Sequence, residues 1–68
     1  SAEVGLRKPD ERFYRLILGR LQVEPQEVVF VDDLPANIDA ATQLGMQAVH
    51  FRSPQQALND VRNLLNHR

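Results

Sequence analysis

The chain has 68 residues, of which 43% are hydrophobic and 25% charged, and this composition is typical of a small globular unit rather than a disordered segment. Its net charge of −1 provides no basic field for nucleic acid or an anionic membrane, and the lack of cysteine excludes disulfides and thiolate zinc sites. No apolar run approaches the roughly 20 residues of a membrane span and "SAEVGLRK" lacks a signal-peptide apolar region, so we expect a cytoplasmic protein without a membrane partner.

The first predicted element is a helix over about residues 10–22, because Pro9 and Asp10 suit a helix start. Its apolar residues at helical spacing are Phe13, Leu16, Ile17 and Leu21. We expect Phe13 and Tyr14 to serve packing, with Tyr14 partly exposed to solvent. The segment "EPQE" predicts a turn, and the apolar residues 28–31 predict a short strand that is buried on both faces of a parallel sheet.

The second half of the chain predicts a helix over about residues 35–44, a strand over 47–51 and a third helix. Pro35 suits the first turn of the second helix, and Gly45 stands where a left-handed C-cap is expected. "SPQQ" is a capping-box pattern, with Ser53 as N-cap and Gln56 three residues later. The apolar face of the third helix consists of Ala57, Leu58, Val61, Leu64 and Leu65.

The order helix, strand, helix, strand, helix predicts an α/β fold whose parallel strands are joined by a right-handed crossover. Two parallel strands are too few for a stable sheet, because strand edges and apolar helix faces would stay exposed. We therefore expect residues 1–68 to form the C-terminal part of a doubly wound, Rossmann-like parallel sheet domain.

Two adjacent acids, Asp32 and Asp33, follow the first predicted strand, and ligands of open α/β sheets bind beyond the carboxyl ends of the strands. Because neighbouring strand residues point to opposite faces, we assign Asp33 to the ligand side and expect Asp32 to brace a neighbouring loop. A hard cation such as Mg²⁺ would offset the repulsion between the two acids. The alternative is that Asp33 caps the second helix and Asp32 is solvated on a turn.

Lys8 precedes Pro9 at the entrance to the first helix. A lysine held near the two acids would neutralise them and could hold a phosphoryl group, whereas by itself it would be a solvated helix end. We interpret His50 as a packed or edge residue of the second strand and His67 as part of a fraying terminus. We expect surface roles for Arg7 and Arg52.

The chain resembles the haloacid dehalogenase superfamily of hydrolases, and the resemblance covers its whole length. The third motif of that family is similar to "GLRKPDERFYRLIL", and the fourth is similar to "VVFVDDLPANIDAATQLGM". The resemblance is nearest to the subgroup that includes the phosphatase domain of soluble epoxide hydrolases. The resemblance implies catalytic roles for Lys8 and Asp32, a Mg²⁺ ligand in Asp33, and a supporting role for Asn37, a position where many members carry a second acid. Dehalogenating members usually have Ser-Asn in place of the acidic pair, so Asp-Asp favours phosphate chemistry.

The family's Asp-x-Asp nucleophile motif and its second-motif Ser or Thr are missing from this sequence. The resemblance therefore implies that the chain is the C-terminal part of a Mg²⁺-dependent phosphatase, whose partner is the N-terminal part of the same domain. It also implies that this phosphatase acts on a small phosphorylated metabolite through an aspartyl-phosphate. By itself the chain is expected to be inactive. Two alternatives stay open: a non-catalytic interaction module that retains half of the fold, and a relative that cleaves carbon–halogen bonds or transfers phosphoryl groups to acceptors other than water.

Overall fold

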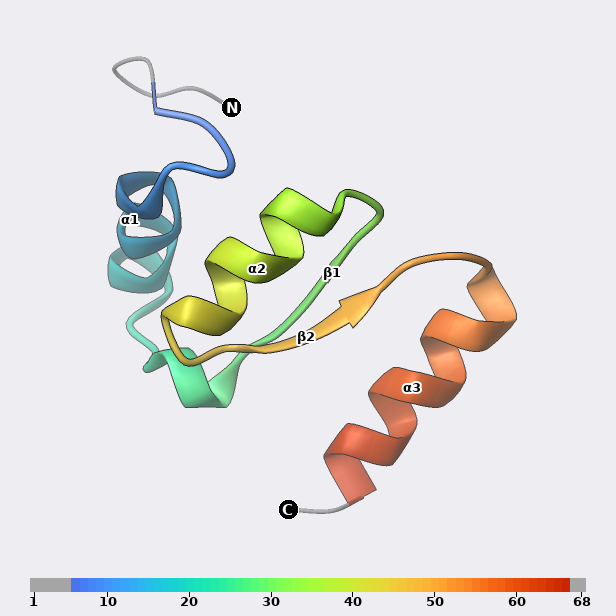
Figure 1. The fold of residues 1–68 in the computed structure, drawn as a ribbon. Helices are drawn as coiled ribbons and strands as arrows, with labels where there is room; N and C mark the ends of the chain where they lie inside the picture. The colour runs from blue at the N-terminus through green and yellow to red at the C-terminus, as the bar shows by residue number, and fades with distance from the viewer. Residues whose placement is uncertain (1–5, 67–68) are drawn as a thin grey trace.

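The computed structural model describes residues 6–66, and His67 therefore lies outside the described residues. Its elements follow the predicted order and are joined by short connections (Figure 1). They are α1 (Glu11–Leu21), the 3₁₀ turn η2 (Pro25–Glu27), β1 (Val29–Asp32), α2 (Pro35–Gln43), β2 (Gln47–His50) and α3 (Pro54–Asn66). The α/β class predicted from the sequence is confirmed.

The two strands form a parallel pair, in which Val29 lies opposite Gln47 and Asp32 lies opposite His50. In Figure 1, α2 lies along one side of the strands, next to α1, and α3 extends away on the other side of β2. Because the strands are parallel, their carboxyl ends meet at the same edge of the sheet. Asp32 and His50 are thus neighbours at that edge.

Local chemistry explains where the helices begin and end. Asp10 caps α1, because its side chain accepts a hydrogen bond from the Arg12 N–H at 2.9 Å. Gly45 has a φ of 102° and ends α2 in a Schellman motif, in which the Met46 N–H donates to the Ala41 carbonyl. The capping box of α3 is confirmed, since the Gln56 N–H donates to Ser53 Oγ and the Ser53 N–H to Gln56 Oε1.

The buried core lies where α1, α2 and one face of β1 meet, and Tyr14 is its largest fully buried side chain. The predicted apolar face of α1 was partly wrong: Tyr14 and Leu18 are buried, whereas Ile17 and Leu21 are 38% and 62% exposed. The helix carries two overlapping apolar stripes, and α1 contacts mainly α2, so only one stripe can be covered. The expectation that Tyr14 is partly exposed was also wrong.

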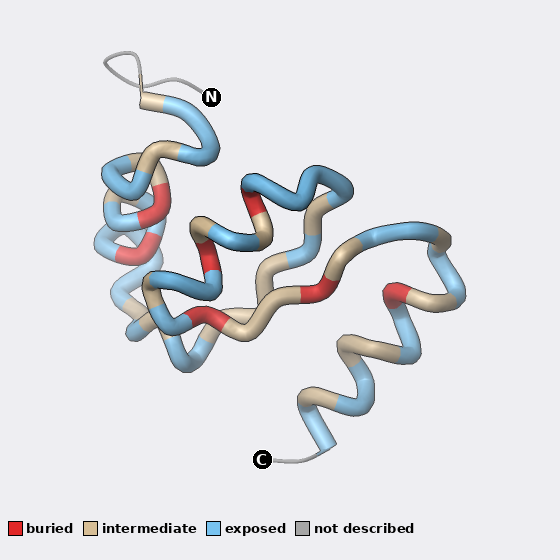
Figure 2. Tube along the Cα trace, in the orientation of Figure 1, coloured by how far each residue is buried: buried red, intermediate tan, exposed pale blue. Residues whose placement is uncertain are grey.

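Large apolar side chains remain exposed elsewhere, and α3 presents the clearest case. Ala57 is the buried residue of this helix, while Leu58 and Leu65 are 51% and 53% exposed. Figure 2 shows that most of α3 is intermediate or exposed. Val31 and Phe51, near the end of the sheet, are likewise exposed. Within residues 6–66 there is no helix of the length and apolar character that a bilayer crossing requires.

Candidate functional site

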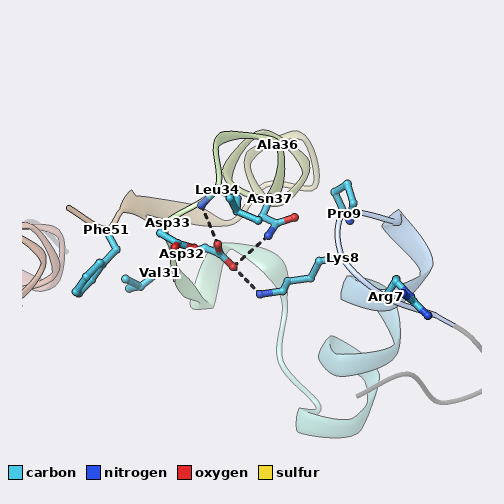
Figure 3. Close-up of a pocket in the computed structure, with 10 residues that line it drawn as sticks. All are labelled: Arg7, Lys8, Pro9, Val31, Asp32, Asp33, Leu34, Ala36, Asn37 and Phe51. Carbon is cyan, nitrogen blue, oxygen red and sulfur yellow. Dashed lines mark hydrogen bonds and ion pairs between the residues drawn. The ribbon is translucent and has the colours of Figure 1, made fainter. Parts of the chain in front are cut away.

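The site is built around Asp32, which is the last residue of β1 and has a side chain that is only 6% exposed. Its Oδ2 accepts hydrogen bonds from Lys8 Nζ at 2.6 Å and from Asn37 Nδ2 at 3.3 Å, and its Oδ1 accepts one from the Leu34 N–H at 2.9 Å (Figure 3). The bond to Leu34 braces the loop after β1. Asp32 is therefore not the solvated turn residue of the alternative interpretation.

The Lys8–Asp32 ion pair joins two segments that are 24 residues apart in the sequence. The hydrogen bond to Lys8 is the main reason why the pKa of Asp32 lies well below its usual range, and the same bond raises the pKa of Lys8. The Lys8 ammonium also lies 5.8 Å from the centre of the Phe30 ring, within the range of a cation–π contact. Lys8 is consequently a protonated ammonium that is held in place at the carboxyl end of β1.

Asn37 is a buried polar residue in the first turns of α2, and the amide that it donates to Asp32 helps to hold that carboxylate. Its backbone carbonyl accepts a hydrogen bond from the Tyr14 hydroxyl at 3.1 Å, which ties α2 to α1. Burial raises the pKa of the Tyr14 hydroxyl, so it stays a donor at neutral pH. Tyr14 thus supports the site indirectly, a role that the sequence analysis missed because this contact spans 23 residues.

Asp33 differs from its neighbour, because its carboxylate is exposed and has no hydrogen-bond or ion-pair partner among residues 6–66. The alternative in which Asp33 caps α2 is wrong: the N-cap residue is Leu34, and no side chain caps this helix end. The Asp33 backbone carbonyl accepts a hydrogen bond from His50 Nε2 at 3.0 Å. The two adjacent acids therefore have different environments, one satisfied and one available.

An open pocket of about 650 Å³ connects these side chains (Figure 3). Its charged and polar lining consists of Arg7, Lys8, Asp32, Asp33 and Asn37, and its apolar lining of Pro9, Val31, Leu34, Ala36 and Phe51. The structure brings all four residues predicted for the site to this pocket. Arg7 also lines the pocket, although only a surface role was predicted for it.

A hard divalent cation fits this lining through Asp33, since a free carboxylate is the ligand that Mg²⁺ prefers. Both oxygens of Asp32 are already engaged by N–H donors. In the described part of the chain there is no group of three or more His, Cys, Asp or Glu residues that could hold a metal ion. Among the described residues that line the pocket, Asp33 therefore offers the one free carboxylate, and water, substrate phosphate or other protein groups would complete the coordination.

A family model for haloacid dehalogenase-like hydrolases matches residues 1–45. Flavin mononucleotide hydrolase 1 of Arabidopsis thaliana is 38% identical over 64 residues, which are 94% of this chain and 26% of that protein. Bifunctional epoxide hydrolase 2 of Sus scrofa is 39% identical over 61 residues, which are 90% of this chain and 11% of that protein. A sesquiterpene phosphatase of Aspergillus oryzae is 35% identical over 65 residues, which are 96% of this chain and 33% of that protein. The chain thus spans a third or less of these curated relatives.

A solved structure of an uncharacterized protein from Corynebacterium glutamicum has a similar fold. It superposes with a TM-score of 0.84 at 22% sequence identity, and the match covers 93% of this chain and 46% of that one. Lys8, Asp32, Asp33 and Asn37 all lie within the 45 residues that the family model matches.

Proposed function

The chain belongs to the haloacid dehalogenase-like hydrolases, and from this we propose that it is the part of a Mg²⁺-dependent phosphatase that holds the transferring phosphoryl group. The observation that supports the proposal is the fixed ammonium of Lys8 beside the free carboxylate of Asp33, on one open pocket. Transfer of a phosphoryl group needs positive charge around its oxygens. Lys8 and a cation bound by Asp33 would supply this charge.

Each residue of the pocket has a separate task in this proposal. Lys8 Nζ would bind a phosphoryl oxygen, because Asp32 and Phe30 hold the ammonium at the pocket without removing all of its donors. Asp32 keeps Lys8 protonated and oriented, and Asn37 keeps Asp32 in place. Asp33 would hold Mg²⁺, which when bound would neutralise charge on the phosphoryl group.

The proposed reaction also needs a nucleophile that residues 1–68 do not carry. We assign this part to an Asp-x-Asp motif in an N-terminal segment of the same domain, whose carboxylate would attack the phosphorus of the ester held by Lys8 and form an aspartyl-phosphate. The P–O bond to the alcohol would break, the alcohol would leave with a proton from solvent, and water would then hydrolyse the aspartyl-phosphate to free phosphate. The flavin mononucleotide hydrolase and the sesquiterpene phosphatase are named for very different organic groups. These names support a phosphate ester as the substrate of this chain, with a small phosphorylated metabolite as the proposed class.

Asp33→Asn in the complete polypeptide tests the proposal. We expect it to lower Mg²⁺-dependent phosphatase turnover roughly 100-fold, because it removes a charged ligand of a metal that contributes several kcal/mol. The melting temperature should stay unchanged, since the Asp33 carboxylate has no partner in the described structure. Asp39→Asn is the matched control, because Asp39 is another exposed acid, on α2, and lies outside the pocket lining. Unchanged turnover in Asp33→Asn would contradict the assignment, whatever the melting temperature.

A further inference from the structure

The peptide group between Asp33 and Leu34 is held at both of its polar ends. Its carbonyl, on Asp33, accepts a hydrogen bond from His50 Nε2 at 3.0 Å, and its N–H, on Leu34, donates to Asp32 Oδ1 at 2.9 Å. The preceding carbonyl, on Asp32, accepts from the Phe51 N–H at 2.7 Å. The backbone on both sides of the Asp33 α-carbon is therefore fixed, although Asp33 lies in neither β1 nor α2.

This double attachment matters because nothing else in the described chain holds the Asp33 side chain. The φ and ψ of Asp33 set the direction in which its Cα–Cβ bond leaves the loop, and freeing the Asp33–Leu34 peptide would let this ψ vary and the carboxylate swing away from the pocket. Asp32 holds the N–H end of the peptide, and His50 is the side chain that holds its carbonyl end. Without His50 the peptide would be fixed at one end only.

The chemistry of the contact defines the state of His50. A carbonyl oxygen can only accept a hydrogen bond, so Nε2 must carry the proton. Both the neutral Nε2–H tautomer and the imidazolium satisfy this requirement, and the contact therefore does not depend on the charge of the ring.

His50 itself is anchored through the first turn of α3. It is the last residue of β2, and its backbone carbonyl accepts a hydrogen bond from Gln56 Nε2 at 2.9 Å. The Gln56 side chain also accepts from the Ser53 N–H and donates to Asp60 Oδ2. The capping network of α3 thus continues through His50 to the loop that carries Asp33.

We propose that His50 is a positioning residue, whose Nε2–H fixes the Asp33–Leu34 peptide and thereby directs the Asp33 carboxylate into the pocket. The part of this inference that concerns Mg²⁺ rests on the proposed function. His50 lies at the end of β2, as expected of an edge residue, but its ring N–H donates to the loop of the site.

The test uses the complete polypeptide with His50→Phe, which keeps a ring without the donor, and His50→Gln, whose terminal amide can donate from a similar position. Thr42→Val is the matched control, because it removes another hydrogen bond from a side chain to a backbone carbonyl, at 2.9 Å to Asp39 and away from the pocket. The measurements are exchange of the Leu34 amide hydrogen without metal, Mg²⁺ affinity by calorimetry, and the nitrogen chemical shifts of the His50 ring.

His50→Phe should accelerate exchange of the Leu34 amide and weaken Mg²⁺ binding, each about fivefold, which corresponds to one ordinary hydrogen bond. His50→Gln should restore most of both, Thr42→Val should change neither, and the wild-type spectrum should show a protonated Nε2. Equal behaviour of the Phe variant and the wild type, or of the Phe and Gln variants, would overturn the proposal.

A wild-type ring that is protonated only on Nδ1 would also overturn it, whether or not the variants fold. If the wild type lacked phosphatase activity and Mg²⁺ binding, the proposed function would fail. The exchange rates and ring shifts would still decide whether His50 fixes the loop, so the two failures are distinguishable.

Discussion

The ion pair between Lys8 and Asp32 should couple two distant segments of the chain energetically, and a double-mutant cycle measures this coupling. Lys8→Met removes the ammonium but keeps most of the apolar stem. Asp32→Asn removes the negative charge but keeps an oxygen that can accept from the Leu34 N–H. The two single variants and the double variant then isolate the interaction between the charges.

The expected size follows from distance and exposure. Nζ and Oδ2 are 2.6 Å apart, and the Asp32 side chain is 6% exposed whereas that of Lys8 is 40% exposed. Exposed pairs contribute under about 1 kcal/mol, and breaking a fully buried pair costs about 3–5 kcal/mol. Because one partner is buried and the other is screened by water, we expect a coupling of about 1.5 kcal/mol.

Urea unfolding of the complete polypeptide at neutral pH provides the free energies of unfolding. The control cycle uses Glu11→Gln and Arg15→Met, which remove an exposed ion pair on α1. That pair should give a coupling of about 0.3–0.5 kcal/mol. A Lys8–Asp32 coupling no larger than that of the control would refute the argument that Asp32 depends on Lys8.

The pair should also make stability depend on pH, because hydrogen bonding to Lys8 lowers the pKa of Asp32 in the folded state. The stability that the ionised Asp32 contributes is present above its ordinary pKa of 3.8 and is lost as the pH falls toward its lower folded-state pKa. Unfolding titrations should therefore show a smaller loss of stability on acidification in Asp32→Asn than in the wild type, and an identical loss would contradict this assignment. Residues 1–68 expressed alone should be partly unfolded or self-associated, since Leu58 and Leu65 on α3 are exposed. The isolated residues should also show no saturable Mg²⁺ binding at low millimolar concentration and no hydrolysis of an aryl phosphate. Sedimentation, amide exchange and calorimetry check this, and a monodisperse monomer with protected strand amides or tight metal binding would contradict it.

Local sequence signals predicted the secondary structure well. The Ser53–Gln56 capping box and the Gly45 C-cap depend on residues only a few positions apart, so their chemistry is visible in the sequence. Both ends of α1 and the end of α2 differ from their predicted positions by one residue, because a cap residue such as Asp10 belongs half to the helix, whereas α2 begins at Pro35 as predicted.

Contacts between distant segments were harder to predict. The strand-end position of the acids and the family resemblance brought Lys8, Asp32, Asp33 and Asn37 together as candidates, and the structure places all of them at one pocket. The burial of Tyr14 was missed, because helical spacing does not reveal which of two apolar stripes faces a neighbour. The bond from His50 to the loop was missed, because it joins residues that are 17 positions apart in the sequence. A tyrosine next to an apolar stripe was the available signal for the first of these contacts.

The amide at residue 37 explains how two neighbouring acids can coexist at this site. The family resemblance suggests an acid at this position, but a carboxylate there would face Asp32 Oδ2 across the 3.3 Å that now separate it from Asn37 Nδ2. Two like charges at that distance would raise the pKa of one of them and would compete for the Lys8 ammonium. Asn37 instead donates to Asp32, so that Lys8 balances the Asp32 charge and, among the described residues of the pocket, the Asp33 carboxylate stays without a hydrogen-bond or ion-pair partner. One free carboxylate suits one divalent cation, whereas a second free acid would repel the phosphate oxygens.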